Sequence, residues 1–181
     1  MTKNLLNKPL AKPQDPARRR PYLLAPVTPA ELLSTLVGCV LGIGLLSGLA
    51  WWSGEPWLMA PFGASALLVY AAPKAPFAQP RNLFGGHLIG ALVAISMMNL
   101  FGSNPVSITA ATTLAILLMQ MTNTLHPPGG ATALLCSMLG TTDYGFILFP
   151  LMPGVVIMFV TAVIAGRLFP EDGVYPHDPL A

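Results

Sequence analysis

The stretch His126-Pro127-Pro128-Gly129-Gly130-Ala131-Thr132-Ala133-Leu134-Leu135 decides the fold, because an altered copy of it occurs earlier in the chain. The earlier copy reads Ala60-Pro61-Phe62-Gly63-Ala64-Ser65-Ala66-Leu67-Leu68. A shift of 67 positions, from 61 to 128, pairs Pro61 with Pro128, Gly63 with Gly130 and Ser65 with Thr132. Within apolar sequence, a Pro-x-Gly-Ala-[Ser/Thr] block breaks one helix and starts another. The two copies therefore predict a duplicated unit whose helices are broken at equivalent places.

The composition is that of an integral membrane protein. Charged residues make up 9% of the chain and hydrophobic residues 54%, and the mean hydropathy is +0.64. A soluble domain has roughly a quarter of its residues charged. Between positions 32 and 166 the charged residues are Glu55, Lys74, Arg81 and Asp143. The chain is therefore expected to be an all-α, polytopic membrane bundle.

Both ends of the chain are polar. Residues 1–29 carry six Lys and Arg residues and six prolines, which predicts a disordered, basic, Pro-rich cytoplasmic tail. At its end, Thr28 with Pro29 and Glu31 has the pattern of a helix N-terminus with a capping box. Residues 169–181 predict a second, polar cytoplasmic tail.

Residues 30–168 are expected to form a single transmembrane domain with six elements. Four stretches are apolar and near the ~20 residues that cross a bilayer, at about 32–52, 83–101, 106–121 and 146–168. Two short elements interrupted by Pro and Gly lie between them, at about 57–72 and 127–139.

Charge predicts how the two copies are oriented. The first repeat covers about 30–101 and the second about 102–168, each as span, broken element, span. If the broken elements cross, each repeat makes three crossings, and the second copy is inverted. With the N-terminus cytoplasmic, all nine Lys and Arg residues then lie inside, as the positive-inside rule expects. Re-entrant elements would place Lys74 and Arg81 outside, so we prefer a 3+3 inverted repeat.

The broken elements can form an anion site. A helix that starts in the membrane points unpaired N–H groups and the positive end of its dipole at whatever lies ahead of it. Such a site needs no buried Lys or Arg, which would cost about 3 kcal/mol or more. The alternative is that the same residues only kink and pack helices, with hydroxyls bonded to the preceding turn. The predicted pathway residues are Pro61, Gly63, Ser65, Asn123, His126, Pro127, Pro128, Gly129, Gly130 and Thr132.

The histidines and the loop before the second span add further candidates. His126 could couple proton movement to anion transfer, or it could satisfy the carbonyls of an interrupted helix. The aligned residue in the first repeat is Met59, so only one copy offers an imidazole there. Arg81, Asn82 and His87 are placed at an inner vestibule that recruits anions, with topological or structural roles as the alternative.

Four blocks of the sequence, in order, resemble the HPP family of integral membrane proteins. The resemblance covers roughly residues 30–168. It implies nitrite transport, described for plastid-envelope and cyanobacterial members, and a fold usually described with four transmembrane helices. The blocks are Ala60-Pro61-Phe62-Gly63-Ala64-Ser65, Gln79-Pro80-Arg81-Asn82, Gly85-Gly86-His87 and the stretch from His126 to Leu134.

We therefore predict transport of a small monovalent anion, nitrite before nitrate, at the two broken-helix starts. The alternatives are a structural or regulatory membrane subunit and, ranked lower, a membrane-embedded enzyme, for which no intramembrane carboxylate or nucleophile–base pair is found. No cofactor, metal or nucleic-acid partner is expected. The expected partners are the anion, the lipid bilayer and further copies in a homo-oligomer. The expected location is a bacterial plasma membrane, with both termini cytoplasmic.

Overall fold

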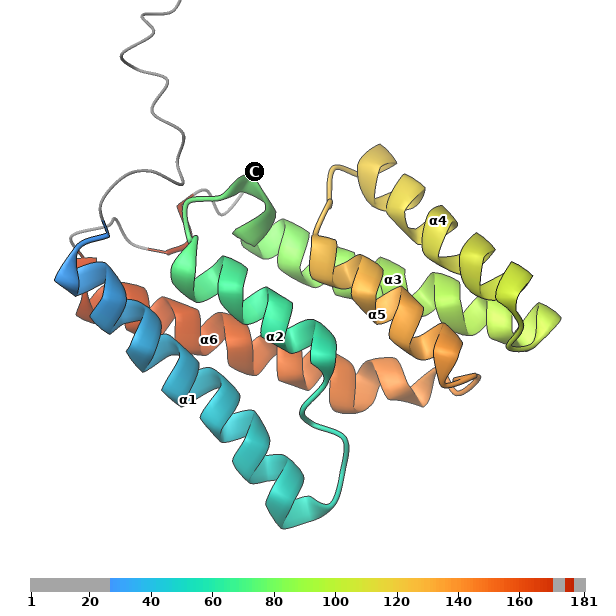
Figure 1. Cartoon of the computed structure of the whole chain (residues 1–181), viewed down its shortest axis with the longest axis horizontal. Coiled ribbons are helices and arrows are strands. Elements are labelled where there is room, and N and C mark those ends of the chain that lie inside the picture. Colours follow the sequence, from blue (N-terminus) through green and yellow to red (C-terminus); the bar gives the residue numbers. More distant parts are fainter. Residues whose placement is uncertain (1–26, 171–174, 178–181) are drawn as a thin grey trace, which may run out of the picture.

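The computed structural model describes residues 27–170 and 175–177. The predicted tail before residue 27 lies outside the described residues. The described chain is all-α, without strands (Figure 1). The α-helices are α1 (Pro29–Ser53), α2 (Ala60–Ala66), α3 (Pro80–Phe101), α4 (Pro105–Met121), α5 (Pro127–Met138) and α6 (Met152–Leu168). In this part of the chain, three short turns join or extend the α-helices. The π-helical turn η3 (Leu67–Ala71) continues α2, the 3-10 turn η4 (Pro76–Ala78) precedes α3, and the π-helical turn η5 (Ile147–Leu151) leads into α6.

Each of these α-helices has a proline at its first or second position. Proline fixes a helical φ and lacks an N–H that would be unpaired there in any case. At α1 the predicted capping box is confirmed, since Thr28 Oγ1 accepts from the Glu31 N–H at 3.1 Å. The reciprocal bond joins the Thr28 N–H to Glu31 Oε2 at 2.7 Å. Proline and the capping residues close to each helix start therefore determine where the helix begins.

Among the described residues, three helices are long and apolar enough to cross a membrane: α1, α3 and Ile147–Leu168. Ala60–Ala71 and Pro105–Met121 are shorter apolar helices. The seven residues of α2 with the five of η3, and the 12 residues of α5, each give about 18 Å of helix. That is less than the ~30 Å hydrocarbon core, so neither broken element crosses as a helix alone.

The helix bounds repeat with the spacing predicted from the sequence. Shifting Ala60–Ala71 by 67 positions gives 127–138, the bounds of α5, and shifting Pro80–Phe101 gives 147–168, the bounds of η5 with α6. In Figure 1 successive helices alternate in direction, so each helix of the second half runs opposite to its counterpart. An inverted repeat with exact two-fold symmetry stays a prediction.

At each end of the bundle a side chain of α3 donates a hydrogen bond to the backbone of a loop. The start of α3 meets the end of α4 where Arg81 donates to the Thr122 carbonyl at 2.8 Å. At the other end, Asn99 near the end of α3 donates to the Thr142 carbonyl before α6 at 2.8 Å. These bonds tie helix ends that are about 40 positions apart in the sequence.

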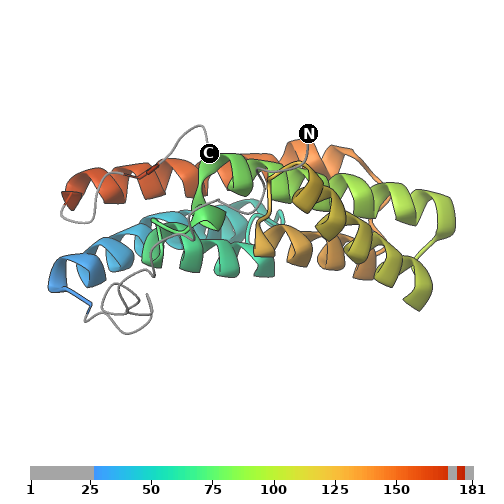
Figure 2. The same cartoon turned by 90° about the horizontal axis from the view of Figure 1, so that it is seen from above.

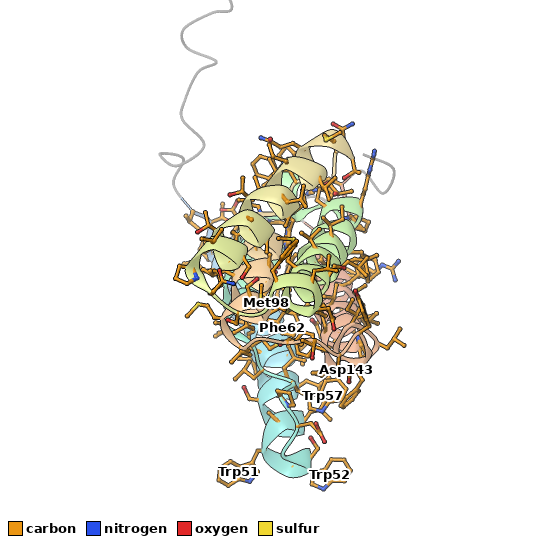
Figure 3. All side chains as sticks on the ribbon, turned by 90° about the vertical axis from the view of Figure 1, so that its right-hand side faces the viewer. Trp51, Trp52, Trp57, Phe62, Met98 and Asp143 are labelled. Atoms are coloured by element: carbon orange, nitrogen blue, oxygen red, sulfur yellow. The ribbon has the colours of Figure 1, made fainter. Side chains whose placement is uncertain are left out.

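Charge is divided between these ends. Lys74, Arg81 and Arg167 lie at what we call the basic end, with the start of α1. Glu55 and Asp143 lie at the opposite end, where Trp51 and Trp52 project from the tip of α1, 93% and 84% exposed (Figure 3). Aromatic side chains of this kind are enriched at membrane interfaces.

Helices α3 and α5 make the closest helix contact of the described chain. They lie in separate layers of the bundle, as Figure 2 shows. A Cβ on Gly90 would lie 2.2 Å from the Gly129 carbonyl oxygen, and one on Gly129 would lie 2.4 Å from the Gly86 carbonyl oxygen. Small residues let membrane helices approach to backbone contact in this way. The three glycines therefore set the distance between α3 and α5.

Tyr70 and Tyr175 close the basic end of the core. Tyr70 packs against Gly38 and Gly42 of α1 and shares a 2.7 Å hydrogen bond with Thr161 of α6. Tyr175 is 1% exposed and donates to the Ala78 carbonyl at 2.7 Å. Part of the predicted C-terminal tail, beyond residue 168, thus packs on the helical domain.

Replacing Gly90 with Ala should lower the free energy of unfolding by about 1–3 kcal/mol, because the added methyl group meets backbone that cannot rotate away. Thermal unfolding of the purified protein in detergent measures the change. Gly44→Ala is the matched control, since a Cβ there meets no atom within 4 Å. Equal melting temperatures for Gly90→Ala and wild type would contradict the close α3–α5 contact.

Candidate functional site

Four buried polar side chains from α2, α3, α5 and the N-cap of α5 meet inside the bundle. We call them the Ser65 cluster: Ser65, His87, His126 and Thr132. All four are 0% exposed. Ser65 Oγ lies 2.8 Å from His87 Nε2 and 3.0 Å from His126 Nε2. His87 Nδ1 lies 2.7 Å from Thr132 Oγ1. Buried polar groups inside a membrane domain are costly and mark ion or substrate pathways or proton relays.

The cluster is anchored at both ends by backbone carbonyl groups. His126 Nδ1 lies 2.7 Å from the Phe77 carbonyl oxygen in η4. Thr132 Oγ1 lies 3.1 Å from the Pro128 carbonyl oxygen, one turn earlier in α5. A chain of hydrogen bonds therefore runs from the basic-end loop, through two imidazoles and two hydroxyls, into α5.

The broken helices meet at this cluster, but their first turns do not supply the expected N–H donors. Pro61, Pro127 and Pro128 have no N–H. The next N–H groups are already bonded, Phe62 to the Met59 carbonyl at 2.9 Å and Gly129 to the His126 carbonyl at 2.8 Å. The Phe62 and Gly129 N–H groups are therefore not free, and the donors that meet at the cluster are side chains. An anion site at the two helix starts stays a prediction.

Several predicted pathway residues lie elsewhere. Gly63 is exposed and lines an apolar groove of about 630 Å³ between α1 and α2, on the outside of the bundle. A Cβ on Gly130 would lie 3.7 Å from Ile116 of α4. Asn123 is exposed in the turn after α4, with φ +54°. None of the cluster's hydrogen bonds involves these three residues.

The predicted vestibule residues separate. Arg81 is exposed at the basic end, and Asn82 is buried behind it, donating to the Leu125 carbonyl at 2.7 Å. His87, grouped with them from the sequence, lies instead inside the Ser65 cluster. Six residue positions, or about 9 Å along the helix axis, separate it from Arg81, and the α3–α5 contact covers it.

Sequence reasoning did not find the Phe77 carbonyl or the packing role of Phe62. Phe62 is 0% exposed, meets His87 edge-on with ring centroids 5.5 Å apart, and fills the space beside Gly154 of α6. The 67-residue shift maps His87 onto Gly154, where the second repeat has no side chain at all. A histidine in one copy aligned with a glycine in the other is the sequence signal that could have indicated a site formed mainly by one copy.

Ser65→Ala should destabilise the protein by about 1–3 kcal/mol, because two buried imidazole nitrogens lose their shared partner. Ser137→Ala is the matched control, since within the described residues the buried Ser137 hydroxyl has no hydrogen-bond partner. Removing that unpaired group should leave stability unchanged or raise it. Unfolding of both variants in detergent tests this, and equal effects would mean that the Ser65 bonds contribute nothing.

The sequence comparisons agree with this architecture. The family model described as the transmembrane region of HPP matches residues 24–176. A transmembrane protein of Dictyostelium discoideum is 39% identical over 127 residues, 66% of this chain and 44% of that protein. A second one is 37% identical over 126 residues, 66% of this chain and 40% of that protein.

The chain thus spans less than half the length of the curated relatives that it matches. No solved structure matches it. The family match covers the whole helical domain, including all four sequence blocks and each residue of the Ser65 cluster. With its apolar helices, this chain is therefore an integral membrane protein that belongs to the HPP transmembrane family.

Proposed function

We propose that this protein transports a small monovalent anion across the membrane, with nitrite as the first candidate and nitrate as the second. The observation that carries the proposal is the Ser65 cluster, a fully buried set of hydroxyl and imidazole groups where two half-length helices meet. Transporters commonly place their substrate site where broken helices meet near the bilayer midplane.

The chemistry of the cluster suits an anion better than a cation. Its side chains can all donate hydrogen bonds, and the starts of α2 and α5 add the positive ends of two helix dipoles. Glu55 and Asp143, the carboxylates between positions 32 and 166, are exposed at the opposite end. A cation pathway would be expected to carry carboxylates or converging carbonyls along its length.

The division of charge supports an orientation as part of the proposal. We place the basic end in the cytoplasm, because positively charged loops favour that side. The described ends of both terminal helices, at Pro29 and Leu168, then face the cytoplasm. A bacterial plasma membrane and a homo-oligomer stay predictions, and the relatives found come from Dictyostelium discoideum.

Thr132→Val should reduce nitrite influx into proteoliposomes about fivefold, because it removes one buried donor, worth about 1 kcal/mol, while keeping the side-chain shape. Influx is measured with a clamped membrane potential, and empty liposomes correct for nitrous acid leak. Thr109→Val is the matched control. Thr109 bonds to the carbonyl of Pro105, as Thr132 does to Pro128, but on an exposed face of α4.

Three outcomes separate the candidate functions. Saturable nitrite influx that falls in Thr132→Val but not in Thr109→Val supports the transport pathway through the cluster. Equal loss in both variants argues against a pathway at Thr132. Absence of flux for nitrite, nitrate and chloride from folded protein would reject transport by this chain alone and favour a structural or regulatory subunit.

The orientation is tested by single cysteines in a chain without Cys39 and Cys136. An impermeant maleimide added to intact cells should label Glu55→Cys, while Lys74→Cys should react only after the cells are permeabilised. Labelling of Lys74→Cys from outside would reject the six-element topology and favour four spans.

A further inference from the structure

The hydrogen bonds of the Ser65 cluster constrain how many protons it holds. The Phe77 carbonyl can only accept, so His126 Nδ1 carries a proton and donates to it over 2.7 Å. The remaining protons are distributed among His126 Nε2, the Ser65 and Thr132 hydroxyls, and the two nitrogens of His87. Every unpaired polar group in this environment costs free energy, so the favoured distributions leave none unpaired.

With both imidazoles neutral, one such distribution exists. The Thr132 hydroxyl donates to His87 Nδ1, His87 Nε2 donates to Ser65 Oγ, and the Ser65 hydroxyl donates to His126 Nε2. Each of these three contacts, at 2.7, 2.8 and 3.0 Å, is then a hydrogen bond, and every donor points from Thr132 toward His126.

One extra proton fits without any movement of the heavy atoms. The Thr132 hydroxyl turns from His87 to the Pro128 carbonyl, 3.1 Å away, and His87 Nδ1 takes the proton and donates to Thr132 Oγ1. A second extra proton does not fit. Both Nε2 atoms would then donate to Ser65, its own hydrogen would lose its acceptor, and two cations would lie with ring centroids 5.1 Å apart.

The extra proton can also move between the rings. The N–H bond at His87 Nε2 breaks as an O–H bond forms at Ser65, while the original Ser65 O–H bond breaks and an N–H bond forms at His126 Nε2. Protons and charge balance, and the positive charge passes from α3 to the start of α5 without a free ion.

The surroundings add no fixed charge to the cluster. Phe62 from α2, Gly154 from α6 and the Phe77 carbonyl from η4 surround the rings. The nearby titratable groups on the packed helices are Cys136, one turn beyond Thr132, and Tyr70, which bonds to Thr161. Lys74 and Arg81 are exposed at the basic end. Any positive charge at the cluster must therefore be a proton on an imidazole.

We infer that the Ser65 cluster is a single-proton site, shared between His87 and His126 through Ser65, and that it supplies the charge for a one-to-one proton–anion symport. The symport rests on the proposed anion transport, whereas the proton site stands on the hydrogen-bond geometry alone. The two parts are therefore tested separately.

The proton site is tested by NMR of the full chain in lipid nanodiscs, with ring-¹⁵N histidine and His177→Gln to leave only the two cluster rings. Lowering the pH should add one proton to the pair, with both Nε2 signals shifting at a common midpoint. In Ser65→Ala the signals should shift independently, and in Ser137→Ala they should behave as in wild type. Uptake of two protons or none by folded wild-type protein, or independent shifts in it, would overturn the site.

The coupling is tested by nitrite influx into proteoliposomes that contain a pH dye. A one-to-one symport carries no net charge, so clamping the membrane potential at either sign should leave the influx unchanged, with one proton entering per nitrite. Nitrite influx that follows the potential, without protons, would overturn the coupling and leave anion transport standing. Absence of flux for any anion would instead reject the proposed function, with the NMR titration still deciding the proton site.

Discussion

The backbone contact between α3 and α5 is the constraint on which the rest of the site depends. Gly86, Gly90 and Gly129 leave no room for a Cβ between these helices. Only at that separation can His87 on α3 reach Thr132 on α5 at 2.7 Å, while His126 reaches Ser65 on α2. A bilayer offers little hydrophobic drive for helix association, so packing and internal hydrogen bonds must hold the helices together.

Much of the fold could be predicted from the sequence, because proline and glycine act locally. Proline fixes φ and removes a donor wherever it stands, so Pro61 and Pro128 already marked equivalent positions in the two copies. The bounds of α1, α3 and α5 lie within a few residues of the predicted ranges. Charge placement on the loops also predicts the orientation of the spans in the membrane, and that orientation stays a prediction.

The site was less predictable, because it depends on contacts between distant residues. Ser65, His126 and Thr132 stood out as polar residues in the repeated block, whereas the partnership with His87 required knowing how α3 packs on α5. The sequence also predicts that helices starting at Pro61 and Pro128 leave their first N–H groups unpaired. In the structure the Phe62 and Gly129 N–H groups are bonded within the first turn, to the Met59 and His126 carbonyls.

The missing N–H groups at Pro127 and Pro128 have a consequence for selectivity. Fixed backbone dipoles would sort anions by radius and charge, and nitrite, nitrate and chloride differ little in either. A site whose charge is a transferable proton discriminates by Brønsted basicity instead. Nitrite is the conjugate base of a weak acid and can share an imidazolium proton, whereas nitrate and chloride derive from strong acids and cannot. Under the proposed symport, the cluster would therefore favour nitrite over nitrate and chloride by basicity, a property that the helix dipoles cannot distinguish.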